Sequence, residues 1–89
     1  MANLKSSIKR VRSSRRKAAY NQIRRSTAST YVKKARRLIA EGNLEEAQDV
    51  VQLAISALDR AAQRGVIHKN NAARRKSRLV QQLNQAMQS

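Results

Sequence analysis

The side chains of this sequence that could perform chemistry are one imidazole, His68, and five carboxylates, with no cysteine thiol. The carboxylates are Glu41, Glu45, Glu46, Asp49 and Asp59. A zinc site draws its ligands from several Cys or His side chains, which a single His68 does not supply. Acid–base catalysis needs a carboxylate in a cleft beside its partners, whereas these carboxylates are expected on a solvated face of the second helix, with Glu41 at the turn before it. The sequence predicts no enzyme, no metal site and no cofactor.

The basic residues follow a more informative pattern. Twenty lysine and arginine residues give the 89-residue chain a formal net charge of +15. All five acids lie between residues 41 and 59, so segments 1–40 and 60–89 carry unneutralised positive charge. Like charges repel one another, and a polyanion is their natural counterpart. Arginine outnumbers lysine, and its planar guanidinium binds two phosphate oxygens at once. This composition predicts a nucleic-acid-binding protein.

Length and composition limit the fold to one small domain with a thin core. There is no Phe or Trp, and Tyr20 and Tyr31 are the only aromatic residues. The absence of cysteine fits a reducing compartment, and no apolar run approaches the ~20 residues of a membrane span. The acid-free start resembles an organellar transit peptide in composition, but the basic character continues past any plausible cleavage point. We expect marginal stability without the partner.

Two glycines, Gly42 and Gly65, divide a chain without proline into three helical segments. Asn43 is the expected N-cap of the second helix, with Glu46 completing a capping box. His68 or Asn70 is expected to cap the third helix. Short loops force consecutive helices to lie antiparallel. The predicted fold is all-α, a three-helix bundle, with helices at about 20–41, 44–64 and 69–87.

Each predicted helix has an apolar stripe when its residues are placed at about 100° intervals. In the first helix it comprises Tyr20, Ala28, Tyr31, Ala35 and Leu38, with Ile39 at the edge. In the second it comprises Leu44, Val51, Ile55, Leu58 and Ala62, widened by Ala47, Val50, Leu53, Ala54, Ala57 and Ala61. In the third it comprises Ala72, Leu79, Leu83 and Ala86, flanked by Val80 and Met87. The width of the second stripe predicts contact with both other helices.

Residues 1–19 are predicted to be a basic N-terminal arm of a long first helix, projecting beyond a bundle of residues 20–89. The second and third helices are each about 30 Å long and cover only residues 20–41 of the first. The cations of the arm are Lys5, Lys9, Arg10, Arg12, Arg15, Arg16 and Lys17. Alone in water such a segment should fray, whereas among phosphates it can be helical throughout.

Further cations lie opposite the predicted core. In the third helix Arg74 and Arg78 lie opposite the apolar stripe, as does Asn70, while Arg75 flanks it and Lys76 snorkels past it. In the first helix Arg25, Ser26, Lys33 and Arg37 face away from the core, and Arg24 lies nearer the stripe. Neither a recognition helix nor exposed stacking tyrosines are expected. Phosphate and sugar contacts to a structured RNA are favoured. An architectural DNA-binding protein is the alternative, and a membrane-active basic helix is a weaker one.

Specific motifs then narrow the choice. The chain begins Met1-Ala2-Asn3-Leu4-Lys5-Ser6 and continues with Asn21, Arg24-Arg25-Ser26 and Lys33-Lys34. Residues 65–79 read GVIHKNNAARRKSRL, which resembles the signature G-x-I-H-K-N-x-A-A-R-x-K-S-x-L of the bacterial small-subunit ribosomal protein twenty family. The resemblance covers essentially the whole chain. One departure is Ser29-Thr30 in place of an Arg-Thr pair.

The resemblance implies a three-helix bundle that binds 16S rRNA directly, early in assembly of the small ribosomal subunit. It further implies a cytoplasmic location in the ribosome, and contacts with the 5′ domain and the long penultimate helix of the 3′ minor domain. Carried over by position, it adds to the candidate contacts Asn21, Arg24, Arg25, Ser26, Lys33, Lys34, His68, Lys69, Asn70, Arg74, Arg75 and Lys76.

Overall fold

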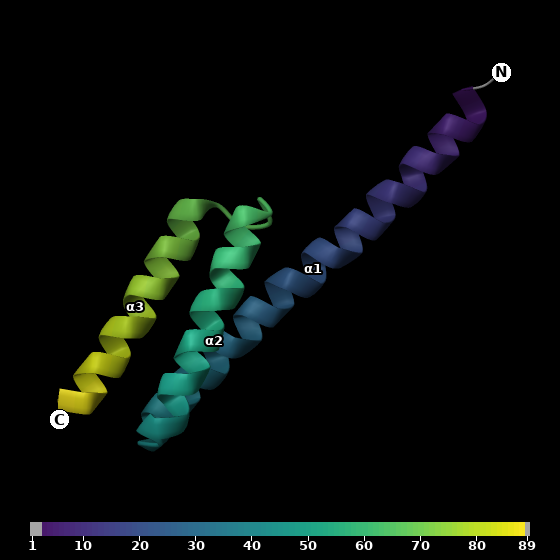
Figure 1. Ribbon diagram of the computed structural model, residues 1–89. Coiled ribbons are helices and arrows are strands. Elements are labelled where there is room, and N and C mark those ends of the chain that lie inside the picture. Colours follow the sequence, from purple (N-terminus) through teal and green to yellow (C-terminus); the bar gives the residue numbers. More distant parts are fainter. Residues whose placement is uncertain (1–2, 89) are drawn as a thin grey trace.

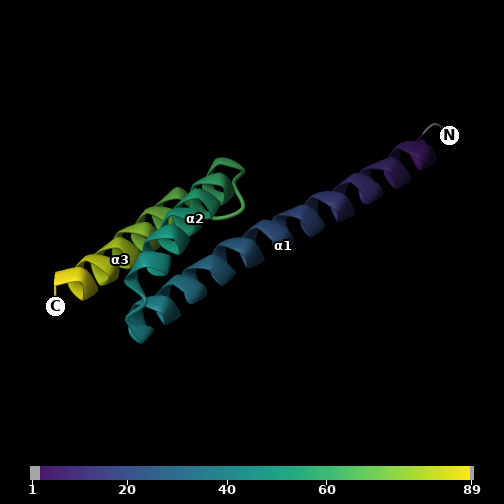
Figure 2. The same ribbon diagram turned by 60° about the horizontal axis from the view of Figure 1, so that its bottom comes forward.

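The protein consists of three α-helices with a long first helix (Figure 1). The computed structural model describes the backbone of residues 3–88 and the side chains of residues 13–88. The helices are α1 (Asn3–Glu41), α2 (Leu44–Gln63) and α3 (Lys69–Gln88), and the described residues contain no strand. Consecutive helices run antiparallel (Figures 1 and 2). The predicted fold class is confirmed.

Both helix–helix turns depend on a glycine in the left-handed region. Gly42 has φ +80° and Gly65 has φ +71°. At the first turn the Gly42 N–H donates to the Ile39 carbonyl and the Asn43 N–H donates to the Leu38 carbonyl. The second turn repeats this pair of bonds, from Gly65 to the Ala62 carbonyl and from Val66 to the Ala61 carbonyl. Both turns are therefore Schellman motifs, which satisfy the last carbonyls of a helix.

The two predicted N-caps have different outcomes. Asn43 occupies the cap position of α2, but its side chain makes no capping hydrogen bond, so the predicted capping box is wrong. The physical reason is the preceding turn: Asn43 donates its N–H to Leu38 and has ψ 73°, short of the extended values typical of an N-cap. At α3 the prediction is confirmed, because the Asn70 N–H donates to Nδ1 of His68 over 3.1 Å.

The core lies along α2, which packs against both α1 and α3, as its wide apolar stripe predicts. Leu58 and Leu79 are the largest fully buried side chains. The buried residues are Ala28, Val32, Ala35, Leu38, Ala47, Val50, Val51, Ala54, Leu58, Ala61, Val66, Ala72, Leu79 and Leu83. Val66 and the half-buried Ile67 fold back from the second turn onto this core. The core is small and rich in alanine.

The burial of several residues differs from the expectation, and Met87, which flanks the predicted stripe of α3, is 51% exposed. Tyr20 is 58% exposed and Leu53 is 49% exposed, whereas Val32 is buried although it was not assigned to the stripe. The buried part of α1 begins only at Ala28, because α2 and its following turn end before they reach Tyr20. The prediction that both tyrosines lie in the core, away from any ligand, is therefore wrong for Tyr20.

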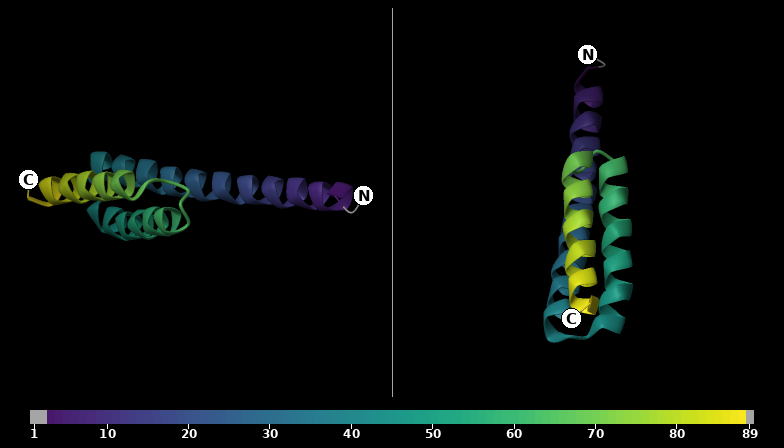
Figure 3. Two further views of the ribbon diagram at one scale, coloured as in Figure 1. Left: turned by 90° about the horizontal axis from the view of Figure 1, so that it is seen from above. Right: turned by 90° about the vertical axis from the view of Figure 1, so that its left-hand side faces the viewer.

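The molecule is elongated, with principal extents of 68 × 21 × 13 Å. At about 1.5 Å per residue, the 39 residues of α1 span about 58 Å and the 20 residues of α2 about 30 Å. The N-terminal part of α1 consequently runs past the ends of α2 and α3 (Figure 3). The predicted projection of the first helix beyond the bundle is present.

Candidate nucleic-acid interface

The projecting part of α1 carries exposed cations. Residues 13–19 are all exposed, including Arg15, Arg16 and Lys17. None of these three side chains forms an ion pair with any described residue. The side chains of four further predicted contacts lie outside the described residues: Lys5, Lys9, Arg10 and Arg12. This part of α1 thus offers several cations to an external anion.

Within the bundle, α1 continues the basic surface on its outer side. Ser26, Lys33 and Lys34 are exposed, as predicted, while Asn21 is half-buried. Arg37 is exposed, and its Nε lies 3.9 Å from Oε1 of Glu41 on the following turn of the helix. An exposed pair of that kind is worth well under about 1 kcal/mol. Arg37 remains available for another anion.

Arg25 links α1 to the start of α3. Its Nε donates to the Val66 carbonyl over 3.3 Å, across a sequence separation of 41 residues. Arg25 is exposed, as predicted, and this bond also ties it to the turn before α3, which the prediction did not include. The turn between α2 and α3 passes beside α1, so the Arg25 guanidinium lies on the side of α1 that meets residues 65–68. Two motifs far apart in the sequence are joined by this contact.

His68 has a defined role at the start of α3. Its Nδ1 accepts a hydrogen bond from the Asn70 N–H, so a neutral imidazole carries its proton on Nε2. The ring is exposed, and the Nε2–H can donate to an external acceptor. Lys69 and Asn70 are exposed next to it, at the positive end of the helix dipole. Cap, cation and dipole favour an anion at this end of α3.

Along α3 the predicted contacts separate into two groups. Arg74 and Arg78 are exposed and have no ion pair with a described residue. Arg75 is half-buried. Lys76 donates from Nζ to Oδ1 of Asp59 over 2.6 Å, which ties α3 to α2. The snorkelling expected of Lys76 therefore ends on a carboxylate of its own chain, and Arg74 and Arg78 are better placed for a ligand.

The negative charges occupy a different surface. Glu45, Glu46 and Asp49 are exposed on α2, and Asp59 is bound to Lys76. Glu41, at the end of α1, is the remaining carboxylate. Exposed surfaces of α1 and α3 are positive and the N-terminal half of α2 is negative. The separation seen along the sequence is retained in space.

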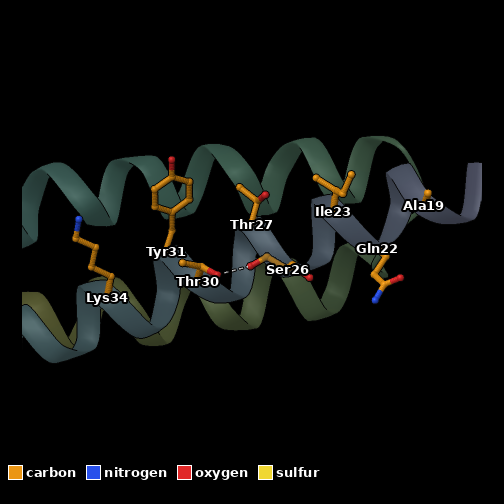
Figure 4. A pocket seen from close by; sticks show the side chains of 8 residues that line it. All are labelled: Ala19, Gln22, Ile23, Ser26, Thr27, Thr30, Tyr31 and Lys34. Atoms are coloured by element: carbon orange, nitrogen blue, oxygen red, sulfur yellow. Dashed lines mark hydrogen bonds between the residues drawn. The ribbon is translucent and has the colours of Figure 1, made fainter. Parts of the chain in front are cut away.

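Sequence reasoning missed a hollow on α1 beside α2. Its lining residues, drawn in Figure 4, are Ala19, Gln22, Ile23, Ser26, Thr27, Thr30, Tyr31 and Lys34. Ile23 is 59% exposed, and the Arg24 guanidinium lies 6.0 Å from the centre of the exposed Tyr20 ring. The available signal was Ile23 itself, an apolar residue that lies outside the predicted stripe of α1.

Two other kinds of site find no support in the described part of the chain. No group of three or more His, Cys, Asp or Glu side chains there is arranged to hold a metal ion. None of the helices among those residues is long and apolar enough to cross a bilayer.

These surfaces define a class: small, basic, all-helical proteins whose cations are displayed for phosphate groups. A family model described as ribosomal protein S20 matches residues 2–84 of this chain. The small ribosomal subunit protein bS20 of Thermomicrobium roseum is 54% identical over 84 residues, which cover 94% of this chain and 85% of the relative. That of Coprothermobacter proteolyticus is 48% identical, covering 99% of this chain and 100% of the relative.

A third relative, from Dictyoglomus thermophilum and also named small ribosomal subunit protein bS20, is 47% identical, covering 98% of this chain and 94% of its own. The chain belongs to the ribosomal protein S20 family. It is a structural, non-enzymatic ribosomal protein. The family resemblance predicted from residues 65–79 is confirmed.

Proposed function

We propose that this protein is a cytoplasmic component of the small ribosomal subunit that binds 16S rRNA directly and stabilises its fold during assembly. The observation that carries the proposal is the placement of unpaired cations. Arg15, Arg16, Arg74 and Arg78 are exposed and have no carboxylate partner among the described residues. The net charge of the chain is +15, and contacts between such cations and phosphates supply most of the affinity of a protein for nucleic acid.

The proposed mechanism is electrostatic and conformational. The outer face of α1 and the polar face of α3 dock on the RNA together, because the shared core holds the helices in one arrangement and the bond from Arg25 to the Val66 carbonyl adds to it. The N-terminal arm, residues 1–19, then lies between RNA segments as a helix and holds them together. The acidic face of α2 is turned away from the RNA.

The finer assignment follows from the family resemblance. We assign the contacts to the 5′ domain and to the long penultimate helix of the 3′ minor domain. An elongated molecule of 68 Å can reach two RNA segments at once. Phosphate contacts fix its orientation, and the RNA is recognised through its shape more than through base sequence.

The test compares variants of the basic and acidic faces. Arg74→Ala and Arg78→Ala should each weaken binding to 16S rRNA several-fold, and each should make the log–log salt slope shallower by about 0.7–0.9, because one phosphate contact is lost. Asp49→Ala should leave affinity unchanged or raise it slightly. Filter binding across a salt series measures both quantities.

Two results contradict the proposal. Equal losses from all three variants would mean that the acidic face also contacts the RNA. Equal competition by duplex DNA and by folded rRNA would identify a general polyanion binder, the architectural DNA-binding alternative. Membership of the ribosomal family favours rRNA.

A further inference from the structure

A second concave surface lies between α1 and α2, on the side where the exposed apolar residues gather. This groove has a volume of about 300 Å³. Its walls are Ile23, Arg24, Thr27 and Tyr31 from α1 and Leu53, Ser56, Ala57 and Arg60 from α2. Three of these residues, Ile23, Thr27 and Tyr31, also line the hollow on the outer side of α1 (Figure 4). The groove therefore opens onto the basic face of α1.

The apolar side chains of the groove are only partly covered by the protein itself. Ile23 is 59% exposed and Leu53 is 49% exposed, and they lie on opposite walls. Tyr31 and Ala57 are half-buried and pack against the core behind them. A ligand that covers these exposed apolar side chains removes them from water, which favours binding. An apolar group of a ligand would cover these side chains.

The charges around the groove define what kind of ligand that group belongs to. Arg24 and Arg60 line opposite walls, and no carboxylate is among the described residues that line them. Asp49 is exposed one helical turn from Leu53, towards the start of α2. One end of the groove is therefore positive, and the acidic surface begins beyond the other. The favoured ligand carries an anion at one end and an uncharged flat group at the other.

We propose that this groove binds an unpaired nucleotide of the RNA, with its base against the apolar side chains of the two walls, Ile23 and Leu53 among them, and its phosphate beside Arg24 and Arg60. The proposal rests on the RNA-binding function proposed above. An unpaired base can leave its stack and pack against protein side chains, whereas bases within a duplex stay stacked. An apolar side chain of a partner protein is a less suitable ligand, because it offers no anion to Arg24 and Arg60.

The hollow on the outer side of α1 provides the approach to the groove. It contains the hydroxyl-bearing Ser26, Thr27 and Thr30, and Lys34 lies at one end. Figure 4 shows Ile23, Thr27 and Tyr31 on the side of α1 that faces α2, with Ser26 on the opposite side of the hollow. The Thr30 hydroxyl already donates to the Ser26 carbonyl over 2.7 Å, so Ser26 and Thr27 carry the hydroxyls that suit the ribose and phosphate of nucleotides flanking the inserted one. The backbone would follow α1 while one base turns into the groove.

The first test separates this contact from the phosphate contacts. Leu53→Gln and Ile23→Gln should each weaken 16S rRNA binding by roughly fivefold to thirtyfold, since apolar burial is lost. The salt slope should stay unchanged, because neither substitution removes a cation. Val80→Gln, on the exposed edge of α3, is the matched control and should not affect binding. Thermal melting of each variant identifies any loss of folding.

An unchanged affinity for both groove variants, with wild-type melting, would overturn the nucleotide site while leaving the rRNA-binding proposal intact. A shallower salt slope would also overturn it, because the groove residues would then act through the charged surface. If the wild-type protein did not bind 16S rRNA, the proposed rRNA-binding function itself would be refuted.

The second test observes the groove directly by NMR of isoleucine methyl groups in the full-length protein. The probes are a perfectly paired RNA hairpin and the same hairpin with one bulged nucleotide. The bulged hairpin should shift the Ile23 methyl signal, and the paired hairpin should shift it far less. Ile39, partly buried against the core, is the internal control and should respond equally to both. Equal shifts of the Ile23 methyl signal with both hairpins would overturn the proposal. It would also be overturned if this signal shifted only when the protein concentration is raised, because a second copy of the chain would then occupy the groove.

Discussion

Residues 13–19 and residues 28–38 belong to the same continuous helix, yet their surroundings differ. Every residue of the first segment is exposed. The second segment contributes Ala28, Val32, Ala35 and Leu38 to the core. Both segments lie in α1, and both contain several arginine and lysine residues. One half of α1 is stabilised by packing, and the other is left to its local propensity.

The two segments of α1 share one secondary structure but are stabilised in different ways. An isolated helix in water is marginal even for favourable sequences, because nucleation is costly and packing supplies most helical stability. The packed half of α1 holds the bundle together. The described side chains of the exposed half, residues 13–19, are not covered by the bundle, and its cations repel one another. A helix of this kind is stabilised by phosphates brought by the partner.

Removal of residues 1–19 should have the largest effect. The truncated protein should bind 16S rRNA roughly a thousandfold more weakly, or about 4 kcal/mol, because seven cations are lost. Its salt slope should be shallower by about 3 or more. Its urea unfolding midpoint should stay close to that of the full-length protein, since residues 13–19 are exposed. Filter binding and circular dichroism measure the two properties. Wild-type affinity and slope would show that the arm plays no part.

A core substitution in α2 tests the packing that stabilises residues 28–38 of α1. Leu58→Ala should lower the free energy of unfolding by about 3 kcal/mol, because it removes a fully buried side chain and leaves a cavity. Leu53→Ala, in the same helix but half-exposed, is the matched control and should cost less than about 1 kcal/mol. Urea titrations followed at 222 nm give both values. Equal losses would mean that the core is not centred on Leu58.

A smaller effect tests whether the arm acts as a helix. Ala18 is exposed in the arm, and Ala18→Gly costs about 1 kcal/mol of helix stability without changing charge. If the arm binds RNA as a helix, affinity should fall up to about fivefold, with an unchanged salt slope. Ala40→Gly, exposed near the end of the packed half, should lower thermal stability and leave RNA affinity unchanged. No change in affinity for Ala18→Gly would favour an extended arm.

Much of the fold follows from local signals in the sequence. Gly42 and Gly65 both adopt positive φ and end their helices in the predicted way. The stripe of α3 is buried at Ala72, Leu79 and Leu83 as expected. Such signals are reliable because they depend on neighbours along the chain, whose spacing the helix fixes. His68 was also identified correctly as a cap.

The errors arise where a distant segment decides the outcome. Tyr20 has the right helical phase for the core but lies beyond the region that α2 covers, so its ring is exposed. Arg25 is exposed as its helical phase predicts, but it also donates to the Val66 carbonyl, a contact that the phase does not reveal. Lys76 reaches Asp59 on the neighbouring helix. A helical wheel gives the direction of a side chain and contains no information on what lies there.

The sequence alone determined that the protein is a basic helical bundle of the ribosomal family, because charge, glycine turns and the motif at residues 65–79 are local properties. The tertiary structure decided which cations are available. It bound Lys76 to Asp59, joined Arg25 to the turn before α3, and left Ile23 and Leu53 exposed on facing walls of a groove. These outcomes depend on the relative positions of helices, which are set by how side chains from different segments pack together.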